Sequence, residues 1–166
     1  MSGGALGTLT VSLRTPAGQE KQRWEAALLE DTAERIVAHG AWRRTLHTRA
    51  GEVAVQNQTL ECYWPGQPYT VAAVYDQGWA LREHYARLVR PLEREGQRLN
   101  LVDLGRHLSL KPDRQLRVIE EARPSTNGTG QASAANAAAW EALMALVKDQ
   151  DGPFSTAFFE RYKPDR

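Results

Sequence analysis

The 166-residue sequence lacks the features that are typical of disulfide-rich, secreted or membrane-spanning proteins. Cys62 is the only cysteine, so no disulfide can form within the chain, as is typical of a reducing compartment. No stretch of about 19 residues is continuously apolar, which excludes a hydrophobic membrane-spanning helix. The N-terminus has no basic segment ahead of an apolar one, so a secretory signal is not expected. The sequence therefore predicts a cytoplasmic protein without membrane contact.

Motifs of catalysis and metal binding are also missing. The four histidines lie far apart, and neither HExxH nor CxxC spacing occurs, so a zinc site is not expected. There is no Gly-x-Ser-x-Gly elbow, and the glycine-rich segment 126–130 lacks the lysine of a phosphate loop. Cys62 needs an imidazole such as His47 to become a nucleophile, and a buried, unreactive thiol is the favoured interpretation. No catalytic residue, metal or cofactor is predicted.

Charge is nearly balanced overall but unevenly distributed. The formal net charge is +1, and 17 of the 21 basic residues are arginine. Residues 81–123 carry ten basic and seven acidic side chains, whereas the segments on either side are slightly acidic. Because arginine contacts phosphate well, this middle segment favours binding to DNA or RNA. A GC-rich, prokaryotic genome is the alternative explanation for the arginine content.

Hydrophobic periodicity in the first part of the chain predicts strands and two helices. Residues 8–13 alternate between apolar and polar side chains, as in a half-buried strand. Thr15 and Pro16 form a typical helix start, so a long helix is expected over 16–39. An antiparallel meander is expected next, with strands at 42–49, 53–64 and 69–75 and a hairpin turn at 49–52. Apolar residues at helical spacing then predict a helix over 79–92.

The remainder of the chain is predicted to be mostly helical. Two short helices near 100–109 and 112–122 are loosely similar to the arrangement in helix-turn-helix proteins. A polar segment at 124–133 is typical of a flexible loop or linker, and a helix is expected over 134–148. The predicted fold class is α+β, with a four-stranded, largely antiparallel sheet packed by the long N-terminal helix. The predicted division is a core domain 1–123, a linker 124–133 and a C-terminal helical segment 134–166.

The segment 61–79 is rich in aromatic residues. Strand parity places Cys62 and Trp64 on one face and Tyr63 on the other. Aromatic residues fill half-buried sheet surfaces, so core packing is favoured over a stacking surface for a ligand. Tyr63 is the side chain of this segment that we expect to be exposed.

The main functional hypothesis is a nucleic-acid-associated protein that contacts phosphate through arginine. The candidate contact residues are Arg43, His47, Arg49, Tyr63, Arg106, Arg114 and Arg117. The alternatives are a protein-interaction or assembly subunit without catalytic activity, or a small enzyme with dispersed site residues. Phe154, Phe158 and Tyr162 follow one another at four-residue spacing, as on one face of a helix. We expect them to dock within a homodimer or on a protein partner, or else on the chain's own domain.

Overall fold

The computed structural model describes residues 5–121 and 130–164, with the side chains of 130–133 left out of the description. The chain forms eleven strands in this part. They are β1 (Thr8–Arg14), β2 (Glu20–Asp31), β3 (Ile36–Gly40), β4 (Arg44–Thr48), β5 (Gly51–Val55), β6 (Gln58–Tyr63), β7 (Tyr69–Tyr75), β8 (Leu81–Val89), β9 (Glu93–Glu95), β10 (Arg98–Leu110) and β11 (Leu116–Glu120). One α-helix, α1 (Gly130–Asp149), and two 3-10 turns, η1 (Gly152–Phe154) and η2 (Glu160–Tyr162), follow them.

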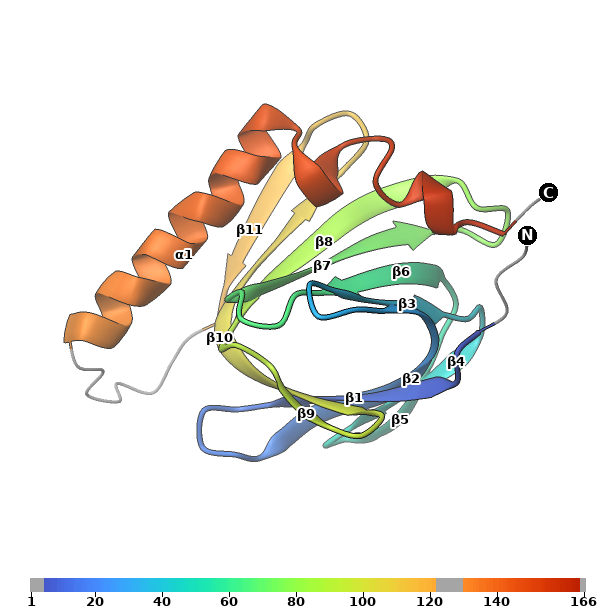
Figure 1. The fold of residues 1–166 in the computed structure, drawn as a ribbon, viewed down its shortest axis with the longest axis horizontal. Coiled ribbons are helices and arrows are strands. Elements are labelled where there is room, and N and C mark those ends of the chain that lie inside the picture. Colours follow the sequence, from blue (N-terminus) through green and yellow to red (C-terminus); the bar gives the residue numbers. More distant parts are fainter. Residues whose placement is uncertain (1–4, 122–129, 165–166) are drawn as a thin grey trace.

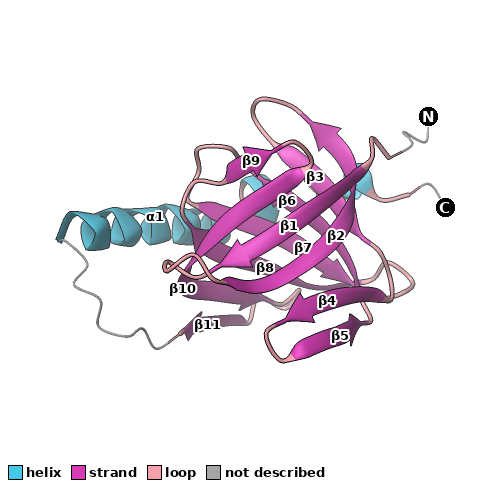
Figure 2. Cartoon of the chain, turned by 90° about the horizontal axis from the view of Figure 1, so that it is seen from below, coloured by secondary structure: helices cyan, strands magenta, loops and turns pink. Residues whose placement is uncertain are grey.

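Seven of the strands close into a barrel (Figures 1 and 2). Their order is β1-β10-β8-β7-β6-β3-β2, and β2 pairs with β1 to complete the circle. All neighbours are antiparallel except β1 and β10, which run parallel. The β4–β5 hairpin extends from β2, while β9 and β11 pair with β10. A closed barrel leaves none of its own seven strands with an unpaired edge.

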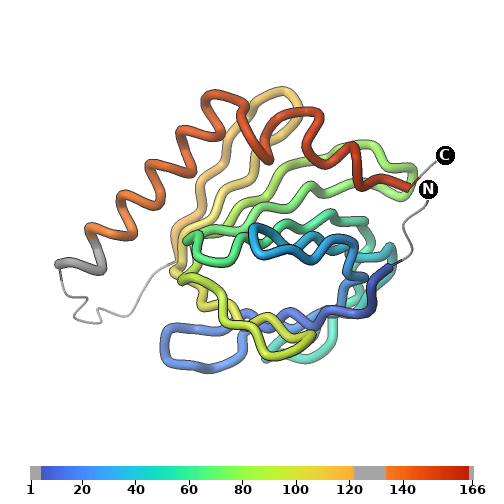
Figure 3. The backbone as a smooth tube through the Cα atoms, viewed as in Figure 1, coloured from blue at the N-terminus to red at the C-terminus, as the bar shows by residue number. Residues whose placement is uncertain are grey.

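The barrel wall separates two apolar clusters. The inner cluster fills part of the barrel and includes Leu9, Val11, Leu28, Leu99 and Leu101. The outer cluster lies between the wall and the C-terminal segment, and its members include Leu60, Val71, Leu108, Leu143 and Phe158. Figures 1 and 3 show that the C-terminal end of α1 lies nearest the barrel. After α1, the chain continues through η1 and η2 along the outside of β7 and β8. Both faces of several strands are therefore covered by protein.

The predicted α+β fold class is wrong, because the helices expected at 16–39 and 79–92 are strands. The first range holds β2 and β3, and the second holds β8. In β2, Leu28 packs inside the barrel and Leu29 packs against the outer cluster. Apolar residues on both faces obscure the two-residue period of a strand, and residues such as Ala, Leu and Glu favour helix locally. Tertiary pairing overrides that local preference.

The helix pair expected at 100–109 and 112–122 is also wrong. Within these ranges the described residues form β10 and β11 and the turn between them, an antiparallel hairpin in which Leu110 lies opposite Leu116. The likeness to helix-turn-helix proteins therefore has no structural basis. The strands at 8–13 and 69–75, the turn at 49–52 and the helix at 134–148 are confirmed by β1, β7, the β4–β5 hairpin and α1. The expected strand 53–64 is divided into β5 and β6, and β6 pairs with β3 and β7.

The C-terminal segment packs on its own barrel. Phe154 and Phe158 are buried in the outer cluster, and the Tyr162 hydroxyl donates a 2.8 Å hydrogen bond to Glu30 Oε2. Their role in association with another chain stays a prediction, as does the three-part domain division. Of the expected linker, residues 124–129 lie outside the described residues and 130–133 belong to α1. Within the described ranges, none of the helices combines the length and the apolar character needed to cross a membrane.

Candidate functional site

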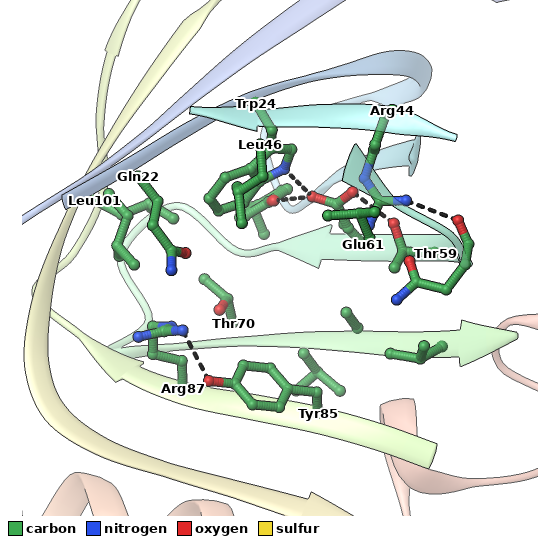
Figure 4. Close-up of a pocket in the computed structure, with 17 residues that line it drawn as sticks. Gln22, Trp24, Arg44, Leu46, Thr59, Glu61, Thr70, Tyr85, Arg87 and Leu101 are labelled. Carbon is green, nitrogen blue, oxygen red and sulfur yellow. Dashed lines mark hydrogen bonds between the residues drawn. The ribbon is translucent and has the colours of Figure 1, made fainter. Parts of the chain in front are cut away.

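A cavity of about 230 Å³ lies inside the barrel. Figure 4 shows Trp24 and Leu46 along one side of it and Tyr85 along the other, with Arg44 and Arg87 toward opposite ends. The walls are mainly apolar, with polar groups at the two ends. Its other lining residues include Leu13, Gln22, Val55, Asn57, Thr59, Glu61, Tyr63, Thr70, Ala72 and Leu101. An apolar pocket with a few convergent polar groups is the common form of a small-molecule site.

The first polar end is organised around Asp103 on β10. This residue is 3 % exposed. One carboxylate oxygen accepts hydrogen bonds from Lys21 Nζ at 2.8 Å and from Arg87 Nη1 at 2.6 Å. The other oxygen accepts the backbone N–H of Gly105 at 2.8 Å. Three donors, two of them cationic, thus fix a single buried carboxylate beside the cavity.

Two irregularities in the strands bring these groups together. The β1–β2 register places Leu13 opposite Gln22 and Arg14 opposite Glu20, so Lys21 is the extra residue of a bulge. A second irregularity in β10 lies between Asp103 and His107 and contains Gly105, whose φ is +84°. A bulge turns a side chain away from the direction that strand alternation would give it. Both bulges flank the Asp103 carboxylate.

The cluster continues on both sides of Asp103. Lys21 Nζ also donates to Glu121 Oε2 at 2.8 Å, and Arg87 Nη2 donates to the Tyr85 hydroxyl at 2.7 Å. The Tyr85 ring lies 5.3 Å from the His107 ring, centroid to centroid. His107 is 8 % exposed, and its Nδ1 atom has no hydrogen-bond partner within the described part of the chain.

The ionisation of these groups follows from burial and charge. Burial alone raises the pKa of Asp103, but Arg87, Lys21 and the Gly105 amide outweigh it, so the pKa lies below the ordinary 3.8. Burial acts to lower the pKa of Lys21, and the bonds to Asp103 and Glu121 overcome it, so that pKa is raised. Burial and Arg87 lower the pKa of His107. At neutral pH the lowered pKa keeps His107 a neutral imidazole beside the ion pair of Lys21 and Asp103.

The second polar end contains Glu61 on β6 and Arg44 on β4. Glu61 accepts hydrogen bonds from Trp24 Nε1 at 2.7 Å, the Tyr63 hydroxyl at 2.5 Å and Thr59 Oγ1 at 2.8 Å. Arg44 Nη1 donates to the carbonyl oxygens of Ala41 and Asn57. Burial lowers the pKa of Arg44.

Gly40 makes room for this packing. A Cβ atom on Gly40 would clash with Thr59 Oγ1 and would lie 2.9 Å from Glu61 Oε2 and 3.0 Å from Arg44 Cζ. Glycine is therefore required at this position for the side chains of the second polar end to keep their arrangement.

The structure does not bring the predicted contact residues into one site. Tyr63 is 2 % exposed, so its expected exposure is wrong. Arg43, His47 and Arg49 lie on or beside the β4–β5 hairpin, where His47 Nδ1 is 3.4 Å from Glu52 and Arg49 donates to Gln19.

The remaining three candidates lie on the β10–β11 hairpin. Arg106 pairs with Glu120 and lies over the Trp140 ring, while Arg114 donates to the Val147 carbonyl oxygen. Arg117 is exposed on β11. Their roles as phosphate contacts stay predictions.

Sequence reasoning missed the residues that line the two polar ends. The available signal was a charged residue inside an otherwise buried strand, as with Glu61 in β6 and Asp103 in β10. Within residues 5–121 and 130–164, no three or more His, Cys, Asp and Glu side chains form a group that could hold a metal ion.

Comparisons with known proteins identify solved structures that have a similar fold. No model of a protein family and no curated protein matches the sequence. Among solved structures, the phosphatase SC4828 with the non-hydrolyzable nucleotide GPCP is similar, with a TM-score of 0.78, 18 % identity, and coverage of 98 % of this chain and 90 % of that one. The complex of FomD with CDP is also similar, with a TM-score of 0.76 and 17 % identity. The match covers 96 % of this chain and 92 % of the FomD chain. The nucleic-acid-binding α+β interpretation is unsupported, and the barrel is the fold that this chain shares with SC4828 and FomD.

Proposed function

We propose that this protein is a small enzyme that hydrolyses a terminal phosphate from a nucleotide held at the barrel cavity. The observation that carries the proposal is the convergence of Lys21 and Arg87 on Asp103, with Arg87 lining one end of an apolar cavity. The fold similarity to a phosphatase with a bound nucleotide and to a protein with bound CDP supports the choice of ligand class. At this identity the similarity supports a hypothesis of function and does not assign one.

The charged cluster is suited to hold phosphate oxygens. Lys21 and Arg87 each have N–H donors beyond those that Asp103 accepts, and cations that are already oriented lose little freedom when they bind an anion. Asp103 has a lowered pKa, so it is a weak proton acceptor and a good anchor for both cations. We assign it a positioning role.

The proposed reaction adds water across a phosphoanhydride bond. The water oxygen bonds to phosphorus, the bridging oxygen leaves with the nucleotide, and the water protons pass to the products and solvent. Negative charge spreads over the phosphoryl oxygens in the transition state, where Lys21 and Arg87 stabilise it.

Release of inorganic phosphate from CDP, GDP, ADP and UDP tests the proposal. Arg87→Gln should lower kcat/KM by about 100-fold, because it removes a donor that stabilises the transition state. Arg82→Gln is the matched control, since Arg82 is an exposed residue of the same strand. Absence of phosphate release by the wild-type protein, or equal activity of the Arg87 variant with circular dichroism unchanged, would contradict the proposal.

A further inference from the structure

The size of the cavity limits what part of a nucleotide it can contain. At about 230 Å³ it is larger than an engineered cavity of about 150 Å³ that binds benzene, and smaller than the roughly 300–1,000 Å³ of pockets that enclose whole ligands. It therefore accommodates one ring system and leaves the phosphates at an end of the cavity. The Trp24 and Tyr85 side chains on opposite sides provide aromatic walls for a flat ring (Figure 4).

Charge distinguishes the two ends of the cavity. Around Arg44 lie Glu61 inside the barrel and, in an adjoining hollow, Glu25 and Glu52. Three carboxylates near one guanidinium disfavour a phosphate there. At the other end Lys21 and Arg87 balance Asp103 and Glu121. A nucleotide therefore binds with its phosphates toward Lys21 and Arg87 and its uncharged ring toward Arg44.

Arg44 has the donors to recognise such a ring. Its Nη1 group donates hydrogen bonds to two backbone carbonyl oxygens, which fix the guanidinium in place. Its Nε and Nη2 groups have no acceptor among the residues that the structure describes, and the side chain lines the cavity. Two parallel N–H donors match two adjacent acceptors, such as O6 and N7 of guanine or O2 and N3 of cytosine. Adenine offers a donor beside its N7 acceptor, and uracil has a donor between its two oxygens.

We infer that Arg44 is a specificity-determining residue that selects guanine or cytosine nucleotides over adenine and uracil nucleotides. This inference rests on the proposed function, because it takes the barrel cavity as the nucleotide site. A bidentate contact of this type discriminates by about 1–3 kcal/mol, which is a factor of about 5 to 150 in affinity.

Isothermal titration with the α,β-methylene analogues of GDP, CDP, ADP and UDP measures the selectivity without hydrolysis. The wild-type protein should bind the guanine and cytosine analogues about tenfold more tightly than the other two. Arg44→Gln should remove that difference, and Arg44→Lys should also remove it, because lysine keeps the charge but lacks the planar fork. Arg43→Gln, at the exposed neighbouring position, should leave the selectivity unchanged.

The outcomes separate this inference from the proposed function. Binding of all four analogues with equal affinity by the wild-type protein would refute the role of Arg44 and leave the proposed function standing. Equal weakening of all four by Arg44→Gln would show that Arg44 contacts the sugar or phosphates, which also refutes it. No binding of any analogue would contradict the proposed function itself. Circular dichroism confirms the fold of each variant, and Arg44→Lys provides the test if Arg44→Gln does not fold.

Discussion

Replacement of Asp103 by asparagine tests whether the buried charge cluster supports the fold as well as the site. The asparagine side chain would keep an oxygen for the Gly105 amide but would leave Lys21 and Arg87 without their shared carboxylate. Removing one partner of a buried ion pair costs about 3–5 kcal/mol, and here Arg87 would stay largely buried without a carboxylate partner, while Lys21 would keep Glu121. For a chain of this length, each kcal/mol lost from the free energy of unfolding lowers Tm by about 2–4 °C. A fall in Tm of roughly 6–20 °C is therefore expected.

The assay is urea and thermal denaturation followed by circular dichroism, with Glu121→Gln as the control. The Glu121 side chain is 44 % exposed, so loss of its pair with Lys21 should cost at most about 1 kcal/mol. A fall in stability of less than about 1 kcal/mol in Asp103→Asn would refute the argument that the cluster is buried and tightly paired.

The pH dependence of stability gives a second measurement on the same variant. The pKa of Asp103 is lowered in the folded state below its ordinary value of 3.8. Its contribution to the free energy of unfolding is therefore present above pH 3.8 and is lost as the pH falls below that value. Asp103→Asn lacks this titration. Its stability should therefore decline less steeply than that of the wild type below about pH 4, and parallel acid profiles would contradict the prediction.

Three further predictions concern packing and titration elsewhere in the chain. Gly40→Ala should lower the free energy of unfolding by about 1–3 kcal/mol, because the new Cβ approaches Glu61 Oε2 to 2.9 Å, whereas Gly78→Ala, with an ordinary 3.5 Å contact, should cost less. Burial and Arg114 lower the pKa of His84 to about 4, so stability should fall as the pH drops from about 6.5 toward 4, and His84→Gln should remove this slope. Phe158→Ala should cost about 3–5 kcal/mol in urea denaturation, and an unchanged mass in light scattering would contradict its predicted role in association.

The sequence predicts an element well where apolar and polar residues alternate without interruption. Residues 8–13 alternate cleanly, because Leu9 and Val11 face the barrel interior while Thr8 and Thr10 face outward. In β2, by contrast, Trp24 and Leu28 face inward while Leu29 meets the outer cluster. No single period survives in such a strand, so the local helix preference of its residues dominates a prediction made from the sequence.

The candidate site depends on contacts that the sequence does not encode locally. Lys21 and Asp103 are 82 residues apart, and the bulge at Lys21 turns it toward the carboxylate. Neither the pairing of β1 with β10 nor a one-residue bulge has a hydrophobic pattern of its own. For the same reason Arg87, which falls in the helix predicted over 79–92, has no recognisable role in the sequence, since its partner Asp103 is known only once the barrel is closed.

The parallel pairing of β1 with β10 has a consequence for how the chain folds during synthesis. Thr10 pairs with Arg98, so the first strand must wait until roughly 90 further residues have left the ribosome before its second neighbour exists. Closing a loop of that length costs about 4 kcal/mol of chain entropy, which places ring closure late in folding. Until then β1 has one open edge, β2 supplies its sole pairing, and the cavity has no complete wall. If the proposed function holds, nucleotide binding should therefore begin only after β10 has joined β1, and its onset would report on barrel closure.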